Sequence, residues 1–277
     1  TNTNAGYGHN LSFKLERPFA NGFNAMAAYN FGISKTTVDP GSIAAGTWFN
    51  NYISNDPNNP PASFSNNDQR HRFIFAATYR KEYGDIAATQ VSLFWEGRNQ
   101  GRTSYFYSTD LNGDNGLNDL LYIPRDQSEM NFQTYDPDGS GPAAPYTAAE
   151  QAADWEAYIA QDAYLSENRG GYAERNGVIF PWIWQADLSI AQEFFIMAGG
   201  KRNTLQFRFD ILNVGNLLND KWGVGWTMNN NRPLRAAGVD ANGAALHRLN
   251  TLGVASDGTI TKLTETFRKT NSINDVW

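Results

Sequence analysis

Apolar and polar residues alternate along two stretches that flank a tight turn within residues 182–216. In the first stretch every second residue from Trp182 to Ile190 is apolar, and in the second Leu205, Phe207 and Phe209 alternate with polar residues. Because successive side chains of a strand point to opposite faces, each stretch predicts a strand with one apolar and one polar face. Each stretch is long enough for the ~9–11 tilted residues that cross a bilayer. The apolar face would then contact lipid, and the polar face a wet lumen.

The same alternation recurs in four earlier segments, at residues 11–16, 24–33, 72–80 and 90–96. A seventh strand is expected to begin near Phe267. Any single segment of this kind would also fit a half-buried strand of a soluble sandwich. Together they predict an all-β, antiparallel fold of about six to seven strands.

Short and long links alternate between these strands. The short links lie at residues 18–22, 83–85 and 197–203, and the long ones at about 36–69, 103–181 and 217–264. Outer-membrane barrels have short periplasmic turns and long extracellular loops. Soluble domains rarely carry loops beyond ~12–15 residues without structure of their own. We therefore expect part of a transmembrane β-barrel, with Trp95, Trp182 and Trp184 toward its outer rim.

One long link is predicted to contain a short helix over residues 147–162. Thr147 can cap the helix, and Glu150 completes a capping box. Ala152, Trp155 and Ile159 share one face at helical spacing. We expect this face to pack on neighbouring loops.

Composition narrows the class of protein. The chain has 277 residues, no cysteine and 14% aromatic residues. No apolar run approaches the ~18 residues of a membrane-spanning helix, which argues against a helical membrane protein. The formal charge of −6 shows no basic excess, so nucleic acid is not expected as a partner.

Five segments together carry a resemblance to a known family. They read DLNGDNGLNDLLYIP (110–124), YLSENRGGYAERN (164–176), PWIWQADLSIAQEF (181–194), LQFRFDILNVGNLLNDKWG (205–223) and TNSINDVW (270–277). In this order they resemble the C-terminal barrel region of TonB-dependent outer-membrane transporters, specifically the Oar-like branch of Bacteroidota and myxobacteria. Residues 10–110 resemble the family only as generic barrel hairpins.

The resemblance implies a barrel of about 22 strands plugged from within. It also implies an N-terminal TonB-box segment that couples to the TonB–ExbB–ExbD complex, and a carboxypeptidase-regulatory-like domain ahead of the plug. Residues 1–277 would be the C-terminal portion of a single barrel domain, with the plug, the N-terminal domain and the last strand outside them. Open strand edges are not viable in lipid, so six strands need the rest of their barrel.

One of the resembling segments is also a candidate metal site. Asp110, Asn112, Asp114, Asn118 and Asp119 place side-chain oxygens largely at every second residue, as calcium loops do. The segment departs from an EF-hand, because Asn115 occupies the sixth position and Leu121 stands where a bidentate Glu belongs. The alternative is an Asp/Asn/Gly turn stabilised by its own hydrogen bonds.

Catalysis is not expected. The chain has three histidines, His9, His71 and His247, and neither a Gly-x-Ser-x-Gly elbow nor a His-Glu-x-x-His motif. Charged residues on the predicted lumen face are expected to hydrate the wall and pair across strands. These residues are Lys14, Glu16, Arg72, Arg80, Glu96, Asp187, Glu193, Arg208 and Asp210.

The sequence therefore predicts a TonB-dependent active transporter in the outer membrane of a Gram-negative bacterium. This fragment would supply barrel wall and substrate-capturing outer loops. Expected partners are outer-membrane lipid, the TonB complex, surface-exposed accessory proteins and a substrate such as a peptide or protein. Two alternatives stay open: a barrel that serves assembly, adhesion or protein passage, and a soluble calcium-binding β-module.

Overall fold

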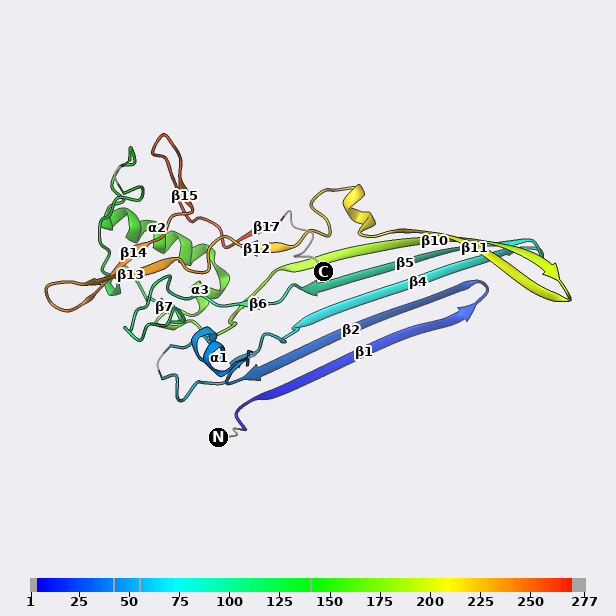
Figure 1. Ribbon diagram of the computed structural model, residues 1–277, viewed down its shortest axis with the longest axis horizontal. Helices are drawn as coiled ribbons and strands as arrows, with labels where there is room; N and C mark the ends of the chain where they lie inside the picture. The colour runs from blue at the N-terminus through cyan, green and yellow to red at the C-terminus, as the bar shows by residue number, and fades with distance from the viewer. Residues whose placement is uncertain (1–3, 42, 55, 140, 271–277) are drawn as a thin grey trace.

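A computed structural model of the chain describes residues 4–41, 43–54, 56–139 and 141–270. Long strands extend side by side at one end, and short elements gather at the other (Figure 1). We call the sheet of six long strands the wall. We call the described parts of residues 37–70, 100–181 and 212–270, which connect or follow the wall strands, the loop subdomain.

The wall is an antiparallel sheet. Its strands are β1 (Tyr7–Ala20), β2 (Phe23–Thr36), β4 (His71–Tyr83), β5 (Ala87–Asn99), β10 (Trp182–Ala198) and β11 (Lys201–Ile211), paired in that order. A two-residue strand, β3 (Ser63–Phe64), extends the pairing of β2. Sequential hairpins pair with one another throughout, as in an up-and-down barrel wall.

Three tight turns close the wall hairpins at the end far from the loop subdomain (Figure 1). Asn21 and Gly22 have φ values of 53° and 79°, and Gly199 and Gly200 have values of 59° and 73°. Left-handed residues at both central positions give the turns that match the twist of the flanking strands. The sequence places Gly or Asn at these positions because other residues adopt a positive φ at a cost.

The register sorts side chains onto two faces. Phe13, Tyr29 and Phe73 lie opposite one another across β1, β2 and β4. The next neighbours in this row are Gly97 on β5 and Trp184 on β10. All of these belong to the predicted apolar face, so the sequence alternation and the strand register agree.

The polar face carries cross-strand hydrogen bonds. The Ser12 hydroxyl donates to Asn30 Oδ1 at 2.7 Å, and Arg72 Nε donates to Glu96 Oε1 at 2.9 Å. Such pairs stabilise neighbouring strands, as expected of a wet inner wall. The all-β, antiparallel fold class is confirmed. Within the described residues, no helix is long and apolar enough to cross a membrane.

The seventh strand is placed differently from the prediction. A strand does begin at Phe267, but β17 (Phe267–Lys269) pairs with β12 (Trp226–Met228) in a separate two-stranded ribbon. Among the described residues it pairs with no wall strand, because its backbone groups are taken up by β12. Residues 271–277 lie outside the described part of the chain.

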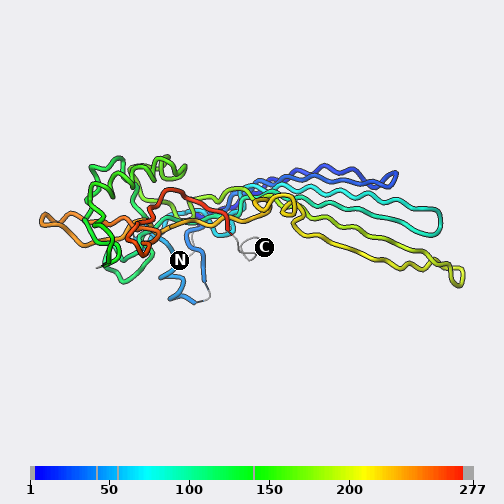
Figure 2. Tube along the Cα trace, turned by 90° about the horizontal axis from the view of Figure 1, so that it is seen from above, coloured from blue at the N-terminus to red at the C-terminus, as the bar shows by residue number. Residues whose placement is uncertain are grey.

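The remaining elements are short. They are α1 (Ala44–Asn50), β6 (Arg102–Thr103), β7 (Tyr122–Ile123), η1 (Gln127–Glu129), α2 (Ala148–Gln161), α3 (Ala163–Glu167), β8 (Gly171–Tyr172), β9 (Val178–Ile179), η2 (Val214–Leu217), β13 (Leu234–Val239), β14 (Ala245–Leu249), β15 (Gly253–Val254) and β16 (Ile260–Thr261). Four further ribbons form: β6 with β9, β7 with β8, β13 with β14, and β15 with β16. Figure 2 shows α1 (light blue) and α2 (green) on opposite sides of the molecule.

Helix α2 supplies the centre of the loop subdomain's core. The predicted helix is confirmed, with the Thr147–Glu150 capping box formed in both directions. Its apolar face is fully buried, with Trp155 and Ile159 both 0% exposed. They pack with residues from distant segments, among them Tyr105, Leu121, Leu234 and Leu249. The second and third long links thus share one packed core and are not separate loops.

Candidate functional site

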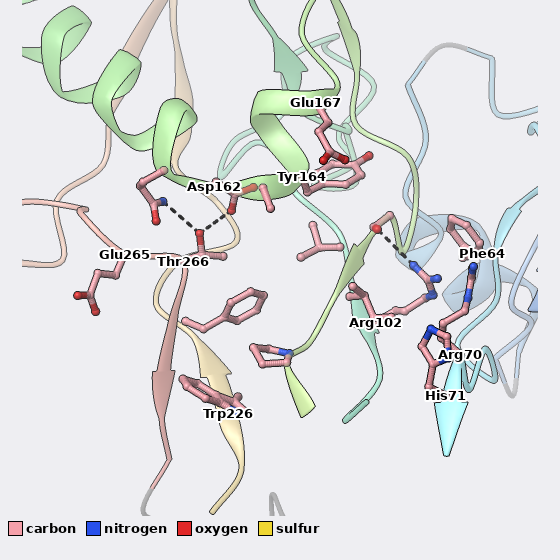
Figure 3. Close-up of a pocket in the computed structure, with 17 residues that line it drawn as sticks. Phe64, Arg70, His71, Arg102, Asp162, Tyr164, Glu167, Trp226, Glu265 and Thr266 are labelled. Carbon is pink, nitrogen blue, oxygen red and sulfur yellow. Dashed lines mark hydrogen bonds between the residues drawn. The ribbon is translucent and has the colours of Figure 1, made fainter. Parts of the chain in front are cut away.

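A hollow of about 710 Å³ lies where the wall meets the loop subdomain. Its lining comes from β3, the start of β4, β6, the α2–α3 junction, β9, β12 and β17. Figure 3 shows Arg70, Arg102 and His71 on one side of it and Asp162, Thr266 and Glu265 on the other. The hollow therefore has a basic side and an acidic side.

The basic side is built around the ring of Phe64. The guanidinium of Arg102 lies 3.7 Å from the ring centroid, the Lys35 ammonium 4.2 Å and the Arg70 guanidinium 5.2 Å. Cations are attracted to the face of an aromatic ring. The buried carboxylate of Asp68 pairs with Arg102 and lies 3.7 Å from Arg70 Nε. Phe64 thus contacts all three cations, and Asp68 pairs with the two arginines that line the hollow.

These three cations differ in the number of hydrogen bonds and ion pairs that they make. Arg102 also donates to the carbonyls of Asn176 and Gly177, and burial lowers its pKa while leaving it charged. Lys35 pairs with Glu174 at 2.7 Å. Arg70 Nε, in contrast, is buried without a hydrogen-bond partner among the described residues. For Arg70 Nε the contact with Asp68 at 3.7 Å is therefore an ion pair without a hydrogen bond.

The acidic side has one structural carboxylate and two exposed ones. Asp162 accepts hydrogen bonds from the Tyr105 hydroxyl at 2.6 Å and from the Leu165 amide at 2.7 Å, which caps α3. Burial raises the pKa of Tyr105 far above its usual range, so this hydroxyl remains a donor. Glu167 and Glu265 are exposed and have no ion pair within the described ranges. They are free to meet a positive group.

Aromatic rings lie between the two sides. Trp226 and Phe267 come from the β12–β17 ribbon, and Tyr164 comes from α3. Burial raises the pKa of Tyr164 to about 12, and its hydroxyl accepts the Glu174 amide at 2.6 Å. The arrangement can bind a ligand that carries both charges and an apolar part.

An aromatic belt crosses the wall just below this hollow. Trp182 stacks on Trp184 with centroids 5.1 Å apart, and Trp184 stacks on Trp95 at 5.0 Å. His71 stacks on Trp182 at 5.7 Å and shares a 2.8 Å hydrogen bond with the Tyr29 hydroxyl. Aromatic belts mark the interface of a bilayer in membrane barrels. The belt separates the wall from the loop subdomain.

The three histidines do not form a common site. His9 lies on the exposed strand β1, His71 in the aromatic belt, and His247 is buried on β14 against Tyr107. Each stands in a different part of the fold. That catalysis is absent stays a prediction.

The candidate metal residues do come together in one loop. Asp110 accepts hydrogen bonds from the Gly113 and Asn115 amides at 2.7 and 2.8 Å. Asp119 accepts from the Leu111 amide at 2.8 Å and from Asn112 Nδ2 at 2.9 Å. Burial raises the pKa of Asp119, and the negative charges of Asp114 and Asp110 raise it further.

A metal site here would need amide oxygens as well as carboxylates. Among the described residues, no three His, Cys, Asp or Glu side chains converge as a site made of those types alone requires. Asn118 belongs to the loop and is 5% exposed, and its Oδ1 is buried without a partner in the described part of the chain. The metal assignment stays a prediction at this point.

Most predicted lumen-face charges have a polar partner. Arg80 pairs with Glu193 and with Glu82, each at 2.7 Å, and Arg208 pairs with Asp210 at 2.8 Å. Lys14 pairs with Glu16 at 2.5 Å, and the Asp187 carboxylate accepts the Asn213 amide at 2.7 Å. These residues lie along the wall strands.

The hollow itself was not predicted from the sequence. Its key residues, Phe64, Arg70, Arg102 and Trp226, stand in four segments that only the tertiary fold brings together. The local signal in the sequence is Arg70, a basic residue directly before the aromatic-rich start of β4. A basic residue in this place does not by itself indicate a cavity.

The comparisons with known proteins identify a family for the part of the chain that contains the wall. A family model described as "Outer membrane beta barrel domain" matches residues 1–221, which is most of the chain. No curated protein and no solved structure matches it. The matched range includes all six wall strands and the first two long links.

Proposed function

This chain belongs to the outer membrane β-barrel domain family and resides in the outer membrane of a Gram-negative bacterium, and we propose that it is part of a TonB-dependent transporter of the Oar-like type. In this proposal the wall strands cross the membrane. The loop subdomain captures substrate at the cell surface. Force from the TonB–ExbB–ExbD complex, acting through an N-terminal plug, opens the path inward.

The loop subdomain is the observation that carries the proposal. Long extracellular loops are common to outer-membrane barrels, but they need not form a packed body of their own. Here the connections form a body with its own buried core around Trp155, and a hollow lies at its junction with the wall. Pockets with a few placed polar groups and aromatic walls are the usual form of ligand sites. A folded surface body of this kind supports capture of a specific ligand.

The charges of the hollow support a substrate of mixed charge. Arg70 places a positive charge on one side, and the exposed carboxylates of Glu167 and Glu265 make no ion pair among the described residues on the other. A peptide carries a carboxylate, an amine and apolar side chains, which match these three features. We therefore propose a peptide or a segment of a protein as the substrate class.

The strand edges of the wall support a larger barrel. β1 and β11 each pair with only one wall strand among the described residues. Unpaired backbone groups are not tolerated in the bilayer core, so each edge needs a further strand. The proposal supplies those strands from the rest of a plugged barrel of about 22 strands.

The experiment that tests the proposal is intact-mass analysis and peptide mapping of the polypeptide purified from outer membranes. We expect a longer chain that carries a plug and a TonB box ahead of residue 1. Depletion of TonB should then abolish uptake of labelled peptides that bind the purified protein. A polypeptide without plug or TonB box would overturn the proposal and favour a barrel for assembly, adhesion or protein passage.

A further inference from the structure

The loop of residues 110–119 is folded around its own side-chain oxygens. Asn112 Oδ1 accepts the Asp114 amide at 2.9 Å, and Asp114 Oδ1 accepts the Gly116 amide at 2.6 Å. With the two amides held by Asp110, the backbone curls around these side-chain oxygens, while Asn112 and Asp114 stay exposed to solvent. This is how a calcium loop presents ligands from every second position.

The sixth position of the loop has the conformation that a calcium loop requires. An EF-hand places Gly there because the chain turns sharply. Asn115 occupies this position and has a φ of 66°. Asn is among the few residues other than Gly that adopt the left-handed region readily. The departure from the EF-hand pattern at Asn115 is therefore one of residue type and not of backbone shape.

A buried oxygen without a partner points into the loop. Asn118 Nδ2 donates to the Asn51 carbonyl at 3.0 Å, which fixes the amide and leaves Oδ1 without a donor among the described residues. A Cβ built on Gly116 would lie 2.4 Å from Asn118 Oδ1 and 2.8 Å from Asp114 Oδ1. The two oxygens therefore lie close together beside Gly116. Buried acceptors are rarely left unsatisfied, so the Asn118 oxygen is expected to bind a positive group.

The negative charge of the loop also favours a bound positive group. Asp110, Asp114 and Asp119 make no ion pair with Lys, Arg or His within the described ranges. Asp119 is 6% exposed. Buried charges in proteins are normally paired or bound to a metal. Asp119 is therefore a buried carboxylate without a counter-charge, in the same loop as Asp110 and Asp114.

We propose that this loop binds a hard divalent cation, Ca²⁺, through side-chain oxygens of Asp110, Asn112, Asp114, Asn118 and Asp119. Ca²⁺ takes six to eight oxygen ligands, and backbone carbonyls or waters would complete the set. Asn112 Nδ2 now donates to Asp114 Oδ2 at 3.3 Å and to Asp119 Oδ1 at 2.9 Å. Asn112 Oδ1 accepts the Asp114 amide at 2.9 Å and keeps a second lone pair that could face the cation.

The cation would join two outer loops. The Ile53 amide donates to the Asn118 carbonyl at 2.9 Å, and the Leu120 amide donates to the Ile53 carbonyl at 2.8 Å. Residues 51–53 belong to the first long link, and residues 110–120 to the second. Binding would therefore brace the loop subdomain from inside. Extracellular calcium modules work at 10⁻⁴–10⁻³ M, which suits a site at the cell surface.

The test is Ca²⁺ titration of the full-length protein in detergent by isothermal calorimetry, with limited proteolysis in Ca²⁺ and in EGTA. We expect binding of Ca²⁺ alone and faster cleavage of the first two long links in EGTA. Asp114→Asn keeps the shape of an exposed side chain and should weaken binding at least tenfold. The matched control is Asp138→Asn, in the other Asp-rich turn of the same subdomain, which should bind as the wild type does.

Two results would overturn this inference. One is no Ca²⁺ binding by wild-type protein that migrates as a folded, heat-modifiable barrel. The other is equal Ca²⁺ affinity in Asp114→Asn and wild type, which would place the ion elsewhere. Neither result bears on TonB coupling, so this proposal and the proposed transport function fail separately.

Discussion

The wall and the loop subdomain bury their apolar side chains in different ways. On the wall, Phe207 and Phe209 are 61% and 65% exposed, whereas Trp155 in the loop subdomain is 0% exposed. The wall side chains need lipid around them, and Trp155 already has its partners. One chain therefore contains a region that is complete only in a membrane and a region that folds as a water-soluble domain does.

The two regions also differ in their hydrogen bonds. In the wall, backbone groups pair between neighbouring strands in a regular ladder. In the loop subdomain, side chains replace much of that ladder. Buried Gln151, for example, donates to the carbonyls of Gln133 and Tyr146 and accepts the Leu249 amide. A single substitution should therefore harm the loop subdomain more than the wall.

Loss of the central tryptophan tests this difference most strongly. Trp155→Ala removes a fully buried ring that stacks on Tyr158 with centroids 5.8 Å apart. Truncation of a buried Trp costs about 3–5 kcal/mol, partly through the cavity it leaves. We expect the loop subdomain of the full-length protein to become sensitive to protease on intact cells. The wall should keep its heat-modifiable migration.

The control for this substitution is Tyr172→Ala, since Tyr172 is 46% exposed in the same subdomain. A surface change of this kind is usually within about 0.5 kcal/mol of neutral. If Trp155→Ala also abolished heat-modifiable migration, the wall would depend on the loop subdomain. The separation of the two regions would then be wrong.

A charge on the lipid face tests the wall in turn. Phe207→Arg places a cation on the apolar face of β11, at a cost of about 2–4 kcal/mol near the bilayer midplane. The neighbouring change Gln206→Arg puts the same charge on the polar face. In the wild type, Gln206 Nε2 donates a hydrogen bond to Glu193 Oε1 at 3.1 Å. Urea titration of protein folded into lipid vesicles should show a large loss for the first variant and a small one for the second. Equal losses would mean that the two faces are assigned wrongly.

The contrast between the regions also explains what the sequence could predict. Wall strands follow from a period-two pattern that is local, so residues 11–16 and 205–211 could be recognised without any partner. The helix was recognised for the same reason, because Thr147 and Glu150 stand three residues apart. Turn positions such as Gly22 and Gly200 follow from local backbone demands. Each of these patterns spans only a few neighbouring residues, so the sequence alone was enough to recognise it.

The rest depended on contacts between distant segments. Pairing of β17 with β12 joins residues about 40 apart, and no alternation pattern names the partner of a strand. The hollow joins Arg70 with Glu265 in the same way. For the loop of residues 110–119 the spacing was local, but the unpartnered Asn118 oxygen was visible only once Asn51 had been placed beside it.

A glycine in the aromatic belt gives a smaller test of the wall. Trp184 lies flat over Gly97, so that a Cβ at this position would stand 2.0 Å from Trp184 Cζ3. Gly97→Ala must displace the indole, and overpacking of this kind costs about 1–3 kcal/mol. We expect a blue- or red-shifted Trp fluorescence maximum and a lower urea midpoint in vesicles. Gly8→Ala on β1, where the nearest atom is 3.7 Å away, should leave both unchanged.

Acid should act on the loop subdomain through His247. Burial lowers the pKa of His247, which is 8% exposed and whose Nδ1 has no partner within the described residues. The unfolded chain therefore binds the proton more readily than the folded one. Stability is present in full above the ordinary histidine value and falls as pH drops from there toward the lowered value, by at most about 1.4 kcal/mol per pH unit for one proton.

The measurement is the rate of loop cleavage by protease between pH 7.5 and 5, with the intact barrel monitored by heat-modifiable migration. His247→Phe keeps a ring against Tyr107, whose centroid is 5.8 Å from that of His247, and it cannot take up a proton. This variant should show a flatter pH dependence than the wild type. If both respond equally to acid, another group controls the loop subdomain, and the buried imidazole is only a packing element there.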